Sequence, residues 1–117
     1  MALAVPSRYF SSLVTQLEQE LGLSSQDLAG AVGVSGRTVE RWRHGALPQN
    51  EALKRLDELV ALHRRLSETF TSLEAARQWL HHPNEYLRGL RPADALRTGH
   101  LQQVHGALEA IDAGIYQ

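Results

Sequence analysis

The chain has 117 residues, with 12 lysines and arginines against 13 aspartates and glutamates, and it contains no cysteine. This length fits one domain, or one small domain with an appendage. The near-neutral charge excludes nucleic-acid binding through general basicity, so such binding needs a local basic patch. The lack of cysteine excludes disulfide frameworks and thiolate metal sites. Together with the lack of a signal peptide or membrane span, it predicts a cytoplasmic protein.

Apolar residues recur at spacings of three and four along most of the chain, and alternating β-branched runs are absent, which predicts an all-α fold. A first amphipathic helix is expected over residues 8–21, with Gly22 as its end. Ser24 is a good cap for a second, short helix over residues 25–32. Asp27 follows three residues later and completes a capping box with a shortened acid.

A third helix follows after a turn that starts at Gly33, a residue able to adopt positive φ. Ser35 caps this helix, which ends near His44. Two short helices joined by a turn of about three residues define a helix-turn-helix. At about 100° per residue the third helix turns Val39 and Trp42 inward. The residues on its outward face are Arg37, Glu40, Arg41 and His44.

These outward residues include long cations at the positions where a helix in the major groove of DNA places its base readers. Arginine binds guanine bidentately, so Arg37 and Arg41 are expected to read bases and Arg43 to contact phosphate. Glu40 either accepts from a cytosine amine or orients an arginine. The alternative for the whole face is a solvated charged surface. The predicted DNA-binding residues are Gln26, Ser35, Arg37, Thr38, Glu40, Arg41, Arg43 and His44.

A long helix is predicted from Asn50 to about Phe70, with an apolar seam between Leu53 and Leu66. The seam covers only about two and a half heptads, too few for an autonomous coiled coil. It therefore either packs within its own subunit or forms part of a dimer interface. We expect at least a homodimer, formed by this helix, by parts of the C-terminal half, or by both. A domain boundary is expected near residue 70, dividing the chain into residues 1–70 and 71–117.

The second half is predicted to hold shorter helices, over residues 73–80, 92–98 and 100–113. Ser72 caps the first of them, and Pro92 occupies the first position of the second, where its missing N–H is not needed. The apolar residues expected to lie mostly in the core are Leu87, Leu90, Leu96, Val104, Leu108 and Ile111. Ile115 and Tyr116 have little sequence left to cover them, so they either dock into a partner or fold back on the last helix.

Residues 24–48, SSQDLAGAVGVSGRTVERWRHGALP, resemble the helix-turn-helix of the Xre/Cro–C1 repressor family. The similar features are the glutamine early in the second helix, the Leu-Ala pair, the Gly-Val-Ser turn, the Arg-Trp pair, and the glycine before a connector with proline. The resemblance implies this fold and DNA binding. Gly36 departs from the family pattern, which has a longer polar residue at that contact position, and weakens sequence discrimination there.

Residues 75–117 resemble the toxin-binding domain of the Xre/MbcA/ParS antitoxins, through Trp79-Leu80, Pro83-Asn84, the Pro-Ala-Asp-Ala-Leu segment and the final Ile-x-x-Gly. The resemblance implies a type II antitoxin that represses its own operon. Its partner would be a RES-domain toxin, an NAD-consuming enzyme encoded alongside, with the antitoxin's C-terminal segment near the toxin's active-site cleft. The candidate toxin-binding residues are Trp79, Asn84, Tyr86, Arg88, Arg91, Ile115, Tyr116 and Gln117.

The histidines do not follow a metal-binding spacing. His81 and His82 are adjacent, and His100 and His105 are five apart, so neither pair shares one helical face. No nucleophile elbow, phosphate-binding glycine loop or catalytic carboxylate pair is recognisable either, so we expect no metal, no cofactor and no enzyme activity. Two alternatives to an antitoxin stay open: a helix-turn-helix repressor whose C-terminal half only dimerises, and a small enzyme or ligand sensor.

Overall fold

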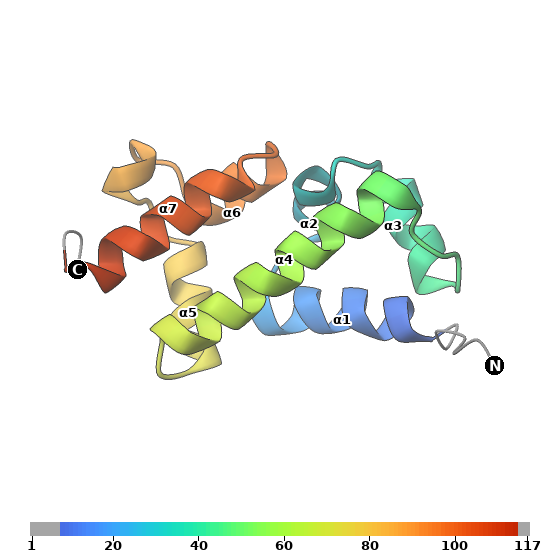
Figure 1. The fold of residues 1–117 in the computed structure, drawn as a ribbon, viewed down its shortest axis with the longest axis horizontal. Coiled ribbons are helices and arrows are strands. Elements are labelled where there is room, and N and C mark those ends of the chain that lie inside the picture. The colour runs from blue at the N-terminus through green and yellow to red at the C-terminus, as the bar shows by residue number, and fades with distance from the viewer. Residues whose placement is uncertain (1–7, 115–117) are drawn as a thin grey trace.

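The computed structural model describes residues 8–114, and it is all-α, with no strand among these residues (Figure 1). The elements are α1 (Tyr9–Leu21), α2 (Ser25–Val32), α3 (Gly36–Arg43), α4 (Asn50–Thr69), α5 (Leu73–Leu80), the 3₁₀ turn η1 (Glu85–Leu87), α6 (Pro92–Arg97) and α7 (Leu101–Asp112). The predicted all-α fold is confirmed. Within the described residues, no helix combines the length and apolar content needed to cross a bilayer.

Side-chain caps determine where α2 and α3 begin. The Ser24 hydroxyl accepts from the Asp27 N–H at 3.0 Å, and the Asp27 carboxylate accepts from the Ser24 N–H at 3.0 Å, so the predicted capping box is present. The Ser35 hydroxyl accepts from the Thr38 N–H at 3.1 Å. Gly33 ends α2 with φ of 80°, a left-handed conformation that glycine adopts at little cost. Local chemistry therefore fixes both sides of the turn between α2 and α3.

The core is one continuous cluster of apolar side chains from every helix. Leu28 of α2, Leu59 of α4, Leu80 of α5 and Leu108 of α7 are all completely buried. Burying one such side chain stabilises the fold by roughly 1.5–3 kcal/mol. Among the residues that the structure describes, no polar or charged residue is buried. The core crosses residue 70 without a break, so the two halves of the chain pack together.

The apolar seam of α4 packs within its own chain. Leu56, Leu59, Leu62 and Leu66 are each at most 1% exposed, and they contribute to the common core. The seam was expected either to pack within its own subunit or to form part of a dimer interface. These four leucines pack within the subunit. Leu53, near the start of α4, keeps 38% of its surface exposed.

The backbones of α2 and α6 touch at Gly30. A Cβ added to Gly30 would lie 1.7 Å from the carbonyl oxygen of Arg97, at the end of α6. No other residue type fits without moving one of the two helices, because the obstructing atoms are backbone atoms. The first helix of the α2–α3 pair is therefore in direct contact with a helix of the C-terminal half.

The helices form an elongated molecule with different elements at its two ends (Figure 1). Helix α3 lies at one end, next to the beginnings of α1 and α4. The C-terminal end of α7 and η1 lie at the other. A hydrogen bond from the Arg65 guanidinium to the Asp112 carboxylate, 3.0 Å long, ties the last turn of α7 to α4.

Candidate functional site

The outward face of α3 carries four exposed polar residues: Arg37, Glu40, Arg41 and His44. On the opposite side Val39 and Trp42 are 0% and 2% exposed, as their predicted inward direction requires. The four exposed residues and Ala46 line a shallow hollow of about 350 Å³. We call these four residues the α3 face.

Other predicted DNA-binding residues surround the start of α2 and α3. Gln26 is exposed in the first turn of α2. Ser35 and Thr38 lie at the start of α3, where their hydroxyls share a hydrogen bond 3.1 Å long. Backbone N–H groups at the first turn of a helix and nearby hydroxyls are suitable donors to a phosphate oxygen. These residues therefore flank the α3 face at the N-terminal end of the helix.

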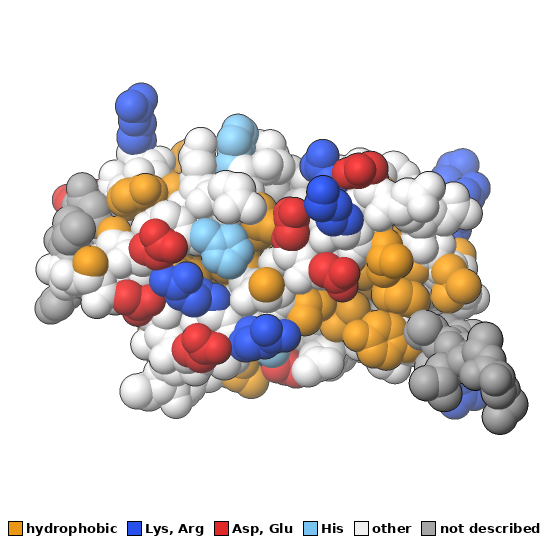
Figure 2. All heavy atoms as spheres, in the orientation of Figure 1, with side chains coloured by type: hydrophobic (Ala, Val, Ile, Leu, Met, Phe, Trp, Pro, Cys, Tyr) orange, Lys and Arg blue, Asp and Glu red, His pale blue; other side chains and the backbone are white. Residues whose placement is uncertain are grey.

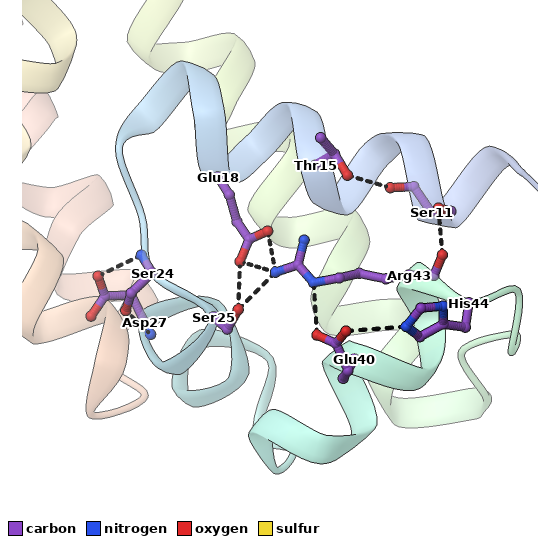
Figure 3. Close-up of polar contacts among 9 residues, drawn as sticks. All are labelled: Ser11, Thr15, Glu18, Ser24, Ser25, Asp27, Glu40, Arg43 and His44. Atoms are coloured by element: carbon purple, nitrogen blue, oxygen red, sulfur yellow. Dashed lines mark hydrogen bonds and ion pairs between the residues drawn. The ribbon is translucent and has the colours of Figure 1, made fainter.

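Arg43 points into the molecule, toward α1 and α2 (Figure 3). Its guanidinium pairs with Glu18 of α1, donates to the Ser25 hydroxyl of α2 at 2.7 Å, and donates through Nε to Glu40 at 3.1 Å. The hydrogen bond with Glu18 raises the pKa of Arg43, against a smaller opposing effect of burial. Because these contacts engage the guanidinium within the chain, the phosphate contact predicted for Arg43 does not fit its position. Arg43 instead joins the first three helices.

Glu40 has contacts on both of its carboxylate oxygens (Figure 3). Oε2 accepts from Arg43 Nε at 3.1 Å, and Oε1 lies 3.2 Å from Nε2 of His44. Two roles were considered for Glu40, accepting from a cytosine amine and orienting an arginine. This geometry matches the second role, with Arg43 as the arginine. Arg37 and Arg41 form no ion pair with any residue that the structure describes. The unpaired positive charge of the α3 face therefore lies on these two arginines.

Replacing Arg43 with alanine is expected to destabilise the fold by about 2 kcal/mol, because charge-assisted hydrogen bonds are lost and a shielded carboxylate remains. That carboxylate belongs to Glu18, whose side chain is only 12% exposed. Urea unfolding measures the effect. Arg41→Ala, in the same helix but on the exposed face, is the matched control, and its free energy of unfolding should change by less than about 0.5 kcal/mol. Equal losses in both variants would contradict a structural role for Arg43.

A tight turn at residues 84–90 lies at the opposite end of the molecule from α3. The Asn84 N–H donates to the Leu90 carbonyl at 3.0 Å, and the Gly89 N–H donates to the Asn84 carbonyl at 2.8 Å. Arg88 and Gly89 have φ of 58° and 89°, two left-handed residues in succession. For a residue with a side chain this conformation costs of order 1–3 kcal/mol, and such strain is concentrated at functional sites. We call residues 84–90 the η1 turn.

The predicted toxin-binding residues have different surroundings. Trp79 is half-buried, with its ring 5.7 Å from that of Phe70 and against the core. Asn84 is half-buried at the base of the η1 turn, whereas Tyr86 and Arg88 are exposed on it. The structure brings Asn84, Tyr86 and Arg88 together and gives Trp79 a packing contact. Three others, Ile115, Tyr116 and Gln117, lie outside the described residues.

Arg91 is exposed directly before α6. Its guanidinium donates two hydrogen bonds to the Asp94 carboxylate, at 2.9 and 2.8 Å. The hydrogen bond from Arg91 is the main reason why the pKa of the Asp94 carboxyl is lowered. Arg97 also contacts this carboxylate, at 3.1 Å. Arg91 therefore stabilises the first turn of α6, and any contact with a partner has to share its guanidinium with Asp94.

Leu90 is a residue whose place the sequence analysis predicted wrongly. It was expected in the core, but half of its surface is exposed, while Leu87 of the same turn is 4% exposed. The left-handed backbone at Arg88 and Gly89 reverses the chain between the two leucines and leaves Leu90 outside. The letters Arg-Gly-Leu-Arg-Pro around this position were a signal for such a turn, since glycine and proline both interrupt helices.

Comparison with known proteins identifies relatives along nearly the whole chain. Residues 65–114 match the family model of the antitoxin Xre/MbcA/ParS C-terminal toxin-binding domain. The mycobacterial cidal antitoxin MbcA of Mycobacterium tuberculosis is 32% identical over 107 residues, which cover 91% of this chain and 94% of MbcA. A second protein of that organism, named as a probable mycobacterial cidal antitoxin, is 32% identical over 116 residues, or 99% of each chain.

A solved structure agrees with these relatives. One chain of the crystal structure of the M. tuberculosis MbcT–MbcA toxin–antitoxin complex superposes with a TM-score of 0.64 at 31% sequence identity. The superposition covers 93% of this chain and 98% of that chain. The superposed region includes the α2–α3 pair as well as the C-terminal helices, so the two chains share the arrangement of all these helices. The chain therefore belongs to the Xre/MbcA/ParS family of antitoxins.

Proposed function

We propose that this protein neutralises a RES-domain, NAD-consuming toxin encoded beside it, by direct binding, and that it represses its own operon through the α2–α3 pair. The observation that carries the proposal is the near full-length similarity to MbcA, a relative whose solved structure is a complex with a toxin. Binding alone accounts for both activities, so no catalytic residue or cofactor is required. Both activities belong in the cytoplasm, where the operator DNA is.

Three features support DNA binding by the α2–α3 pair as a helix-turn-helix. Buried Val39 and Trp42 fix the rotation of α3, so the α3 face points to solvent. Ser35 and Thr38 lie at the N-terminus of α3, and the backbone N–H groups of such a helix end favour a phosphate contact. Arg37 and Arg41 lie four residues apart on one helical face and have no carboxylate partner among the described residues. They are suited to bidentate contacts with guanine.

Replacing Arg37 or Arg41 with alanine is expected to cost roughly 1–3 kcal/mol of specific operator binding. The measurement is binding to a duplex from the promoter of the chain's own operon and to a scrambled duplex, at one salt concentration. Arg64→Ala, an exposed arginine of α4, is the matched control and should bind both duplexes like the unaltered chain. An equal loss of affinity for both duplexes would contradict the assignment of base reading to Arg37 and Arg41.

The toxin-binding function is proposed for the opposite end of the molecule, at the η1 turn and the chain end after α7. Asp112 accepts from Arg65 at 3.0 Å and from the Thr69 hydroxyl at 3.2 Å, which holds the last turn of α7 against α4. The C-terminal end of α7 lies on the side of the molecule where the η1 turn also lies (Figure 1). Trp79, by contrast, packs against Phe70 and the core.

A homodimer is proposed as the DNA-binding form, because one helix-turn-helix reads a short half-site and a pair reads two. Hydrophobic side chains gather over the ends of α1 and α4 nearest the N-terminus (Figure 2). Tyr9 and Leu53 are 51% and 38% exposed there, and they offer apolar contact area to a second copy. Light scattering at tens of micromolar chain should give twice the monomer mass, and a monomer at that concentration would contradict pairing.

A further inference from the structure

A hollow of about 750 Å³ lies beside the η1 turn and α7. Its lining residues are Tyr86, Leu87, Arg88, Leu90 and Gln103. Four of these come from the turn and one from the first turn of α7. The hollow therefore lies where two segments of the C-terminal region meet. Leu87, Leu90 and Gln103 were not among the predicted toxin-binding residues.

Two large apolar side chains remain exposed at this hollow. Leu90 is 50% exposed and Tyr86 is 45% exposed, whereas Leu87 between them in sequence is buried. The Tyr86 ring passes close over α7 at Gly106, where an added Cβ would lie 2.7 Å from the phenolic oxygen. The glycine thus leaves the space that the ring occupies. Exposed leucine and tyrosine side by side in a concave surface are typical of an interaction site.

The hollow is built on a backbone that is already fixed. Hydrogen bonds close the turn from Asn84 to Leu90 and from Gly89 to Asn84, and a third joins the Leu87 N–H to the Asn84 carbonyl at 3.1 Å. The left-handed Arg88 holds the reversal at an energetic cost. A rigid turn loses little conformational entropy when a partner binds, which increases affinity for a given contact area. The strained turn thus holds Leu90 exposed in a fixed position, where a partner can bind it.

The rim indicates the chemistry of the partner surface. Arg88 is exposed and forms no ion pair with any residue that the structure describes, and Gln103 is an exposed hydrogen-bonding group. All five lining residues lie within residues 65–114, which match the toxin-binding domain model. We propose that this hollow receives an apolar side chain of the toxin, next to a toxin carboxylate that pairs with Arg88. This inference rests on the proposed antitoxin function.

Leu90→Ala tests the apolar contact, with the protein encoded by the neighbouring gene as the binding probe. We expect at least about a 10-fold loss of affinity, the size typical of an anchoring side chain at an interface. Leu73→Ala, which truncates a 40% exposed leucine at the start of α5, is the matched control and should bind unchanged. Circular dichroism and thermal unfolding confirm that both variants fold.

The outcomes separate the two levels of the proposal. If the unaltered chain does not bind the neighbouring gene product, the antitoxin function itself fails. If the unaltered chain binds and Leu90→Ala binds equally well, or Leu73→Ala loses as much, only the assignment of the hollow is overturned. A change in the mass of the free Leu90→Ala chain with unchanged toxin affinity would show that the hollow holds a second copy instead.

Arg88→Asn tests the charge without new backbone strain, because asparagine tolerates the left-handed conformation. Toxin affinity should fall several-fold and lose part of its dependence on salt concentration, since one screened ion pair is removed. Unchanged affinity and salt dependence in Arg88→Asn would overturn the carboxylate pairing.

Gly106→Ala keeps α7 helical but displaces the Tyr86 ring. Toxin affinity should therefore fall several-fold, while thermal stability should not fall.

Discussion

The midpoint of thermal unfolding is expected to fall by about 10 °C when Gly30 is replaced by alanine, a loss of about 3 kcal/mol. The added methyl group would lie 1.7 Å from the Arg97 carbonyl oxygen and 2.5 Å from its carbonyl carbon. Both are backbone atoms, so no side-chain rotation relieves the clash and α6 has to move away from α2. Ala93 and Leu96 of α6, 2% and 0% exposed, would lose packing at the same time.

Gly36→Ala is the matched control for this prediction. Gly36 opens α3, and beyond its chain neighbours and the backbone of its own helix nothing lies within 4 Å of an added Cβ, so alanine fits there without a clash. The higher helix propensity of alanine should leave stability unchanged or raise it by about 0.5–1 kcal/mol. If Gly30→Ala unfolds at the same temperature as Gly36→Ala, the close contact between α2 and α6 is not part of the folded protein.

Deleting residues 115–117 is expected to weaken toxin capture at least about 100-fold, because apolar and aromatic anchors of this kind contribute about 2 kcal/mol each to an interface. These residues lie outside the described part of the structure, and the prediction rests on the chemistry of Ile115 and Tyr116 and on the defined end of α7. The core cluster of the described residues ends at Leu108, so helix content and operator binding should be retained. Calorimetric titration with the neighbouring gene product measures the loss.

The reciprocal control is the Arg37→Ala, Arg41→Ala double variant. It alters only exposed side chains of α3, at the far end of the molecule from α7 (Figure 1). It should lose operator binding and keep toxin capture, the opposite of the truncation. A truncated chain that binds toxin with full affinity would move the inhibitory surface to the region between Trp79 and Gly99.

The helices were predictable because local side-chain chemistry determines where they begin. Ser24 with Asp27, Ser35 with Thr38, and Ser72 at the start of α5 cap helices through side-chain to backbone bonds that span three residues. The orientation of α3 was predictable for a similar reason, since the helical period alone separates buried Val39 and Trp42 from the α3 face. The outward positions of Arg37 and Arg41 follow from that period.

Contacts between distant segments were not predictable in this way. The partners of Arg43 and Gly30, namely Glu18 and Arg97, lie on helices whose approach is fixed only when the whole core forms. Periodicity treated Arg43 as one more cation near a helix end, although its guanidinium lies between α1 and α2. Leu90 was misplaced because its exposure depends on two left-handed residues, and apolar spacing carries no information about such a turn.

Growth of cells that express the neighbouring toxin gene, with and without this chain, tests the antitoxin function most directly. We predict that the toxin alone arrests growth, and that co-expression of the unaltered chain restores it, with both proteins recovered as one complex from the extract. Continued arrest in cells that contain the folded chain and the toxin in comparable amounts would contradict the proposed neutralisation.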